Sequence, residues 1–349
     1  MLSATVKVIE GPYFRDLMAQ PAALDATLAW LASEGRWRGV CDFLRGRPWQ
    51  RIVLTGMGSS YYSLHPLSVA LIDAGFAPVT LETAELVHYA LRLCDEDTLI
   101  VAVSQSGGSA ETLRLLEVNQ RSTILGVTNT PQSRLAEAAH HVLSTQAGPE
   151  FSVSCKTYVT ALLALQWLSA AFRGQDAAET LRRLAPASRL VDDYLREWRA
   201  HTAILTHELR GIRHLFFAGR GSSLAAVGTG ALIVKEAAHV HAEGMTSAAF
   251  RHGPMEMLQD DMLTVVFTGE QPTRALNRRL ARQLTAAGRR CAELGSESAV
   301  PALRIPECDP VLKPIVEILP VQMMTLALAG LAGREAGCFE HASKVTDTE

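Results

Sequence analysis

Serines and glycines crowd into one short stretch, SQSGGS at positions 104–109, between an apolar run and a helical pattern. Where a strand turns into a helix, backbone N–H groups point outward and the helix dipole favours negative charge. Serine hydroxyls add further donors. Ordinary N-capping with turn glycines is the alternative, but the stretch holds more serine than a cap requires. We therefore predict a phosphate site, and one without the G-x-x-x-x-G-K-[ST] pattern of a nucleotide P-loop.

Two further residues have types and surroundings that suit proton transfer. Glu236 lies in a strongly apolar stretch that predicts a helix over 230–243. Partial burial there can raise the pKa of a carboxyl group and suit it to acid–base work. The alternative is a helix face turned to solvent. His252 precedes Gly253-Pro254, which fixes the backbone beside the imidazole, although an ordinary loop histidine fits equally well.

Alternating strands and helices must position these groups. Apolar runs predict strands at 51–55, 79–81, 98–104, 124–128, 214–218, 263–268 and 302–305, whereas 1–45 and 158–210 read as helices. Such alternation predicts parallel sheets covered on both faces. Two of the strands are followed by Gly-x-Gly-Ser-Ser, at 56–60 and 219–223, and then by a helix. We interpret this as an internal duplication rather than coincidence. Neither copy has the third glycine of a dinucleotide fingerprint.

Composition excludes several classes of protein. The chain has 349 residues, 48% hydrophobic and 20% charged, with a net charge of −3, which suits a soluble protein of two domains and disfavours nucleic acid as a partner. The N-terminus lacks the apolar stretch of a signal peptide. The stretch 318–332 is too short to span a bilayer and predicts a buried helix, so we expect no membrane partner.

The cysteines and histidines give no sign of a metal or redox site. Six scattered cysteines form no C-x-x-C pair, which suits a reducing, cytoplasmic location. His239 and His241, two residues apart on the predicted helix, would point in different directions. We expect no metal and no cofactor.

Four segments together resemble the sugar isomerase (SIS) family in its double-domain form. They are Ser-Gln-Ser-Gly at 104–107, Lys-Glu-x-x-x-x-His-Ala-Glu at 235–243, His-Gly-Pro at 252–254 and Ser-Lys-Val-Thr at 343–346. The resemblance covers roughly 21–349 and is strongest to the isomerase domain of glucosamine-6-phosphate synthase and to SIS-type glucosamine-6-phosphate deaminases. It implies an α/β fold of two flavodoxin-like SIS domains, each a parallel sheet flanked by helices.

The resemblance also implies roles for individual residues. Glu236 matches the glutamate that moves a proton between C1 and C2, and Lys344 matches a tail lysine that closes over the sugar. His252 matches the ring-opening histidine, which relatives supply from the other subunit of a homodimer. The residues implied to contact the substrate or its phosphate are Ser104, Gln105, Ser106, Ser109, Gly58, Ser59, Ser60, Val153 and Ser154.

Four departures from the patterns of relatives bear on the chemistry. Ile233 replaces a lysine that in relatives contacts the open-chain sugar and can form an imine, which leaves enediol proton transfer by Glu236 possible. Cys155-Lys156 replaces part of the usual Ser-Thr-Lys, and Ser109 stands where threonine is usual. Leu2 stands where a glutaminase domain would need cysteine.

These observations predict an enzyme that isomerises an amino-sugar phosphate and releases ammonia, as from glucosamine-6-phosphate to fructose-6-phosphate. The alternatives are a fructosamine-6-phosphate deglycase, a synthase-like isomerase without the glutaminase domain, and a non-catalytic sugar-phosphate sensor. We expect an N-terminal helical arm (1–45), SIS domains at 46–185 and 200–338, and an active-site tail (339–349).

Overall fold

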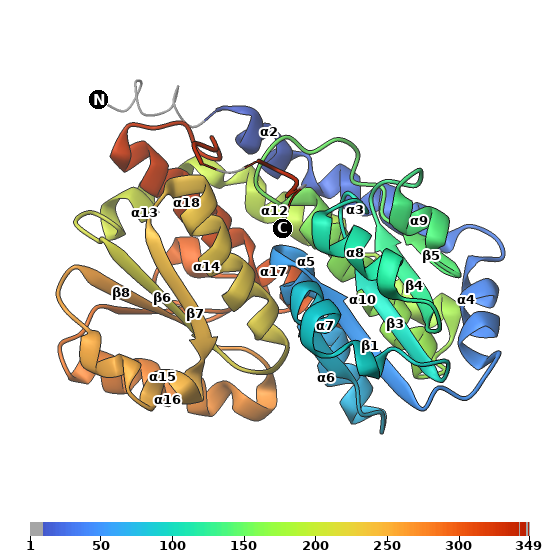
Figure 1. Cartoon of the computed structure of the whole chain (residues 1–349). Helices are drawn as coiled ribbons and strands as arrows, with labels where there is room; N and C mark the ends of the chain where they lie inside the picture. The colour runs from blue at the N-terminus through green and yellow to red at the C-terminus, as the bar shows by residue number, and fades with distance from the viewer. Residues whose placement is uncertain (1–9, 342, 347, 349) are drawn as a thin grey trace. The chain divides into compact units, whose positions relative to one another are not determined.

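The computed structural model describes residues 10–341, 343–346 and 348. The chain divides into two compact units. Unit 1 consists of Met1–Pro21, Phe151–Ser154 and Ala187–Glu340, and unit 2 of Ala22–Glu150, Cys155–Pro186 and His341–Glu349. In both units helices flank a central sheet (Figure 1). The domain boundaries expected from the sequence stay a prediction, as does the part of the helical arm that lies in residues 1–9.

Unit 2 is built on a five-stranded parallel sheet in the order β2-β1-β3-β4-β5. This is the strand order of flavodoxin-like folds, in which the connections reverse direction between the first and third strands. The strands are short and apolar, and β3 and β4 are buried along their whole length. Their bounds are β1 Arg51–Gly56, β2 Val79–Glu82, β3 Thr98–Val103, β4 Thr123–Thr128 and β5 His141–Ser144.

Helices cover both faces of this sheet. On one face Leu86 of α7, Leu115 of α8 and Leu135 of α9 pack with Ile100 and Ala102 of β3. The helix α10 packs with α4, α5, α6 and β4. The helices are α3 Gln20–Ala32, which begins in unit 1, then α4 Arg36–Arg45, α5 Gly58–Ser63, α6 His65–Asp73, α7 Thr83–Tyr89, η1 Leu91–Leu93, α8 Ala110–Val118, α9 Arg134–Ala138, α10 Lys156–Phe172 and α11 Ala177–Leu184.

Unit 1 has a similar architecture, built on a four-stranded parallel sheet in the order β7-β6-β8-β9. β6 therefore corresponds to β1, and β8 to β3. The two parallel sheets confirm the predicted fold class, and their matching strand order agrees with the internal duplication predicted from the two Gly-x-Gly-Ser-Ser turns. The strands are β6 His214–Gly219, β7 His241–Thr246, β8 Met262–Phe267 and β9 Cys291–Leu294.

The helices of unit 1 pack in two groups. Phe250 of α15 and Leu280 and Leu284 of α16 pack against Phe216 and Val266 of the sheet, whereas α13, α14 and α18 pack together. The helices are α2 Pro12–Met18, α12 Ala187–Arg196, α13 Trp198–Glu208, η2 Gly221–Ser223, α14 Leu224–Ala238, α15 Ser247–Arg251, η3 Pro254–Met257, α16 Gln271–Ala286, η4 Pro301–Leu303, η5 Pro310–Leu312, α17 Lys313–Glu317 and α18 Leu319–Ala332.

Two secondary-structure predictions for unit 1 are wrong. The helix predicted over 230–243 ends at Ala238, and His241 and Glu243 lie on strand β7. Their side chains therefore follow strand geometry, not the helical spacing used above. The strand predicted at 302–305 is absent, and a short 3-10 helix, η4, covers Pro301–Leu303. Prolines at 301 and 306 lack the N–H that a strand would donate.

The most apolar helix of the chain is part of the core. The stretch Pro310–Ala332 is long and apolar enough to cross a membrane by length and composition alone, but 83% of its most apolar window is buried inside the protein. Within it, α18 has eleven buried positions, Leu319 to Ala329. Packing in unit 1 thus accounts for the hydrophobicity, as the sequence predicted.

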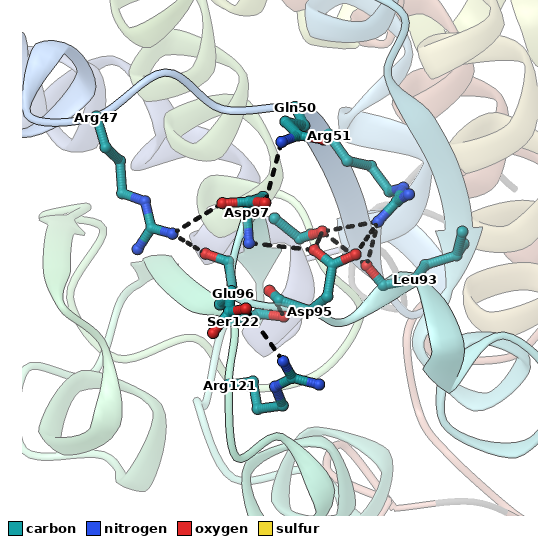
Figure 2. Close-up of polar contacts among 10 residues, drawn as sticks. Arg47, Gln50, Arg51, Leu93, Asp95, Glu96, Asp97, Arg121 and Ser122 are labelled. Carbon is teal, nitrogen blue, oxygen red and sulfur yellow. Dashed lines mark hydrogen bonds and ion pairs between the residues drawn. The ribbon is translucent and has the colours of Figure 1, made fainter.

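A network of charged side chains fixes the amino ends of the strands in unit 2 (Figure 2). Arg51 at the start of β1 donates to Asp95 at 2.8 Å and to the hydroxyl of Thr98, the first residue of β3, at 3.1 Å. The hydrogen bond that Asp95 accepts from Arg51, followed by the one that it accepts from Thr98, lowers the pKa of Asp95. The network lies at the strand ends opposite to the serine-rich turn, so it holds the sheet together away from that turn.

Candidate functional site

The serine-rich turn lies where the sequence predicts it, between β3 and α8 in unit 2. The Ser104 hydroxyl oxygen accepts a hydrogen bond from the Gly107 N–H, and that of Ser106 accepts one from the Gly108 N–H, both at 3.2 Å. Each hydroxyl that accepts in this way keeps its own hydrogen to donate. Ser109 shares a 2.9 Å hydrogen bond with Thr112. The turn thus presents short, positioned hydroxyl donors, which suit an anion such as a phosphate.

The backbone of this turn is held in place by its neighbours. Gly107 has φ of +61°, and a Cβ atom there would come within 2.1 Å of the Ser133 hydroxyl oxygen, so only glycine fits. The Gln105 carbonyl accepts hydrogen bonds from the Asn129 N–H at 3.1 Å and from the Thr128 hydroxyl at 3.2 Å. The donors of the turn are therefore fixed before any ligand arrives, which lowers the cost of binding.

The first Gly-x-Gly-Ser-Ser turn lies directly beside it. Gly56 pairs with Val103 across β1 and β3, so the residues that follow both strands meet at one edge of the sheet. Gly58 has φ of +52° and begins α5. Ser59 is 8% exposed and its hydroxyl has no hydrogen-bond partner in the described part of the chain. Neighbouring strands whose connections run in opposite directions form the usual ligand crevice of such sheets.

A buried carboxylate that sequence reasoning missed, Glu150, organises the next part of unit 2. Its oxygens accept hydrogen bonds from the backbone N–H of Cys155 at 2.9 Å and of Thr157 at 3.1 Å. The Thr157 hydroxyl donates at 2.6 Å, and the Lys344 ammonium group lies 3.0 Å away. The Glu150 side chain is fully buried. A buried carboxylate needs such partners, so Glu150 fixes both the start of α10 and the predicted tail lysine.

The tail also contacts the helix that follows the serine-rich turn. The carbonyl of Thr346 accepts a hydrogen bond from the Ala110 N–H, the first residue of α8, at 3.0 Å. The Ala110 N–H is thus already used within the chain. It is therefore not available to a phosphate, although we expected the N–H groups at this helix start to be free. Unit 2 therefore gathers the serine-rich turn, the Gly58–Ser60 turn and the tail with Lys344.

The other predicted residues belong to unit 1. Glu236 is half-buried on α14, and His252 is exposed directly after α15. Val153 is 1% exposed and Ser154 is half-buried, so only Ser154 of this pair is accessible in the described structure. Ile233, which replaces a lysine of the family pattern, is fully buried. Its side chain is part of the core of unit 1.

The second Gly-x-Gly-Ser-Ser turn has different surroundings, although its place in the fold is the same. The loop after β8 offers Gly269 and Glu270 where the first half offers serines. Glu317 is 1% exposed beside this turn and accepts a hydrogen bond from Ser223 at 3.0 Å. Burial raises the pKa of Glu317 to about 8. The Glu270 carboxyl group in this loop disfavours a phosphate, so the serine-rich turn of the first half remains the candidate phosphate site.

Metal ligands do not gather in the described part of the chain. No group of three or more His, Cys, Asp or Glu side chains there could hold a metal ion.

Comparison with known proteins identifies the family. The family model described as "SIS domain" matches residues 47–171 and 208–330. The chain therefore belongs to the SIS domain family and carries two SIS domains, as the resemblance implied.

The chain is also similar to an enzyme of named activity. The chain is 30% identical over 306 residues to "Glutamine--fructose-6-phosphate aminotransferase [isomerizing]" of Thermococcus kodakarensis, which covers 82% of this chain and 50% of that protein. The chain thus spans about half the length of this curated relative.

Two solved structures share the fold. The C-terminal domain of glucosamine-fructose-6-phosphate aminotransferase from Francisella tularensis superposes with a TM-score of 0.82 at 20% identity, covering 94% of this chain and 98% of that one. Glucosamine-6-phosphate deaminase from Thermotoga maritima gives a TM-score of 0.77 at 16% identity, covering 96% and 99%. The chain thus shares its fold with a member of each group that the sequence motifs indicated.

Proposed function

We propose that this protein is a phosphosugar isomerase that acts on an amino-sugar phosphate and releases ammonia, of the type that converts glucosamine-6-phosphate to fructose-6-phosphate. The observation that supports it most is the set of positioned hydroxyl donors at the serine-rich turn, beside the Gly58–Ser60 turn and with the Lys344 tail in the same unit. A relative named for fructose-6-phosphate and a solved neighbour named for glucosamine-6-phosphate support this choice.

The proposed reaction assigns one role to each group. Ser104 and Ser106 hold the phosphate, and His252 opens the sugar ring. Glu236 then takes the proton from C2 and returns it to C1, so that C1 becomes an alcohol carbon while the C2–nitrogen bond becomes an imine. Water adds to this imine and ammonia leaves, which gives the ketose phosphate. Lys344, held by Glu150, supplies a positive charge near the oxygen atoms that gain charge during proton transfer.

A deglycase acting on a fructosamine-6-phosphate is the second candidate, and the buried Ile233 favours it. In relatives a lysine at this position contacts the open-chain sugar, whereas here the side chain is in the core. A substrate that already carries its nitrogen on a ketose carbon skeleton would not need that lysine for imine formation.

A panel of sugar phosphates separates these functions. The purified protein is incubated with glucosamine-6-phosphate, its epimers and fructosamine-6-phosphates, and ammonia, free amine and ketose phosphate are measured. Ammonia from the amino-sugar phosphates supports the main proposal, and release of an amine from the fructosamines supports the deglycase. Binding without turnover of any compound would instead identify a sensor. Calorimetry with glucosamine against its 6-phosphate checks the phosphate turn, and equal affinities would contradict it.

We also propose a cytoplasmic homodimer in which His252 acts in the site of the partner subunit. An inactive Glu236→Gln chain co-expressed with an inactive His252→Ala chain should regain part of the activity, because some hybrid sites then contain both groups. Full activity in a protein that stays monomeric at every concentration would contradict this arrangement.

A further inference from the structure

One residue of unit 1 has a backbone conformation that its type rarely adopts. His239 follows the last residue of α14 and has φ of +54°. Among the described residues it is the one non-glycine with a positive φ. Helices commonly end on glycine in this conformation, and α18 does so at Gly333, with φ of +67°. A side chain at such a position is strained unless it makes contacts that glycine cannot make.

Both ring nitrogens of His239 are engaged. Nε2 donates to the Cys338 carbonyl at 3.1 Å, and the Arg334 guanidinium donates to Nδ1. The Glu340 carboxylate lies 3.3 Å from the same Arg334 nitrogen and 3.8 Å from Nδ1. Because Arg334 can only donate, Nδ1 carries no hydrogen and the proton is on Nε2. The ring is thus bonded to the segment Arg334–Glu340 from two sides.

This segment, which we name the tail root, precedes the tail that carries Lys344. It contacts two elements of unit 1 that hold predicted site residues. The Gly337 N–H donates to the Ala237 carbonyl in the last turn of α14 at 3.0 Å. A Cβ atom at Gly337 would come within 2.7 Å of the Ser152 hydroxyl oxygen, so the backbone packs tightly against the loop with Val153 and Ser154.

We propose that His239 is a positioning residue that fixes the tail root to the end of α14, three residues beyond Glu236. The imidazole ring thereby fixes the position of the tail root relative to the end of α14 and to the 151–154 loop. We call the contacts of His239 with Arg334 and Cys338 the clasp. They are a property of the free protein, so the proposal rests on the proposed function only where turnover is measured.

Hydrogen exchange measures the clasp without any substrate. In His239→Gly the glycine adopts the same φ without strain, so the melting temperature should stay near that of the wild type, but the peptide 334–341 should exchange at least tenfold faster. If His239 merely ends the helix, glycine would serve equally well and exchange would not change, which would overturn the proposal. His207→Ala, an exposed histidine of α13, is the control and should leave exchange unaltered.

A second variant keeps the test decisive if His239→Gly does not fold. Arg334→Gln removes the partner of Nδ1 and leaves the helix end untouched, so it should also speed exchange in the tail root. Wild-type protection in Arg334→Gln would overturn the proposal.

Turnover gives the final readout once a substrate is known. Misplacement of groups that act on the sugar should lower kcat by about tenfold to a hundredfold, with a smaller change in KM. A protein inactive on all sugar phosphates would contradict the proposed function while leaving the exchange result intact.

Discussion

The carboxyl group of Glu317 provides a direct test of the electrostatics of unit 1. It is 1% exposed, accepts a hydrogen bond from Ser223 and lies at the second Gly-x-Gly-Ser-Ser turn. Burial raises its pKa from the ordinary 4.5 to about 8, against the opposing effects of Ser223 and Lys313. We therefore expect Glu317 to be protonated and neutral in the native protein at pH 7.

The sign and size of the effect follow from proton linkage. Between pH 4.5 and 8 the unfolded chain has lost this proton while the native protein keeps it, so the free energy of unfolding falls as pH rises. Below 4.5 the contribution is fully present, and above 8 the loss is complete. Each pH unit corresponds to about 1.4 kcal/mol, which gives a loss of roughly 3 kcal/mol at pH 7 and about 5 kcal/mol at pH 8.

Glu317→Gln copies the neutral carboxyl group and should remove this loss. The amide oxygen can still accept the Ser223 hydrogen bond. Urea denaturation at pH 5, 7 and 8.5 should show a variant close to the wild type at pH 5 and increasingly more stable as pH rises. Glu197→Gln, an exposed glutamate of the same unit, serves as the control. A difference that does not change with pH, or a variant less stable at pH 8.5, would show that Glu317 is ionised and held by Lys313.

Three further predictions concern unit 2. Gly107→Ala should weaken sugar-phosphate binding at least tenfold in calorimetry, because the new Cβ collides with Ser133 at a positive φ; unchanged affinity would refute the pre-formed turn. Glu150→Gln should destabilise the protein by about 3 kcal/mol in urea denaturation, since Lys344 and two backbone N–H groups lose a buried charge; a loss below about 0.5 kcal/mol would contradict it. Asp95→Asn should lower the melting temperature at pH 7, and the difference should shrink as the pH falls through the lowered native pKa of Asp95, because the group stabilises the fold only while it is ionised.

The central strands could be predicted from the sequence because their signal is local. β1, β3, β6 and β8 are continuous apolar runs, and β1 and β6 end in the same glycine pattern. Of the edge strands, β2 was predicted at 79–81, whereas β5, β7 and β9 gave no such signal. β7 reads His-Ala-Glu-Gly-Met-Thr, and only Ala242 of these residues is buried. It follows an apolar helix with no proline or glycine between the two elements. The helix ends there because His239 adopts a left-handed conformation, which a contact with Arg334, 95 residues away, supports.

The same difference, between features encoded locally and features that depend on distant contacts, applies to the candidate site. The serine-rich turn is contiguous, so its chemistry was visible in the sequence. Glu150 was not, because its partners are the backbone of α10 and Lys344, 194 residues further along the chain. The departure at Cys155 and Lys156 is tolerated for a related reason. The Cys155 backbone N–H binds Glu150 whatever the side chain is, and Lys156 instead donates to the Pro149 carbonyl at 2.6 Å.

Solvent exchange catalysed by Glu236 tests the central proposal most directly. The wild-type protein is incubated in deuterium oxide with the amino-sugar phosphate that the panel identifies, and deuterium at C1 and C2 is read by NMR. Glu236→Gln keeps the shape of the side chain but removes the base, which typically contributes about 10²–10⁴-fold to the rate. We predict deuterium at C1 or C2 in the wild type, none in the variant, and nearly unchanged substrate affinity. A Glu236→Gln protein that still exchanges deuterium and turns over at a near-normal rate would contradict the account.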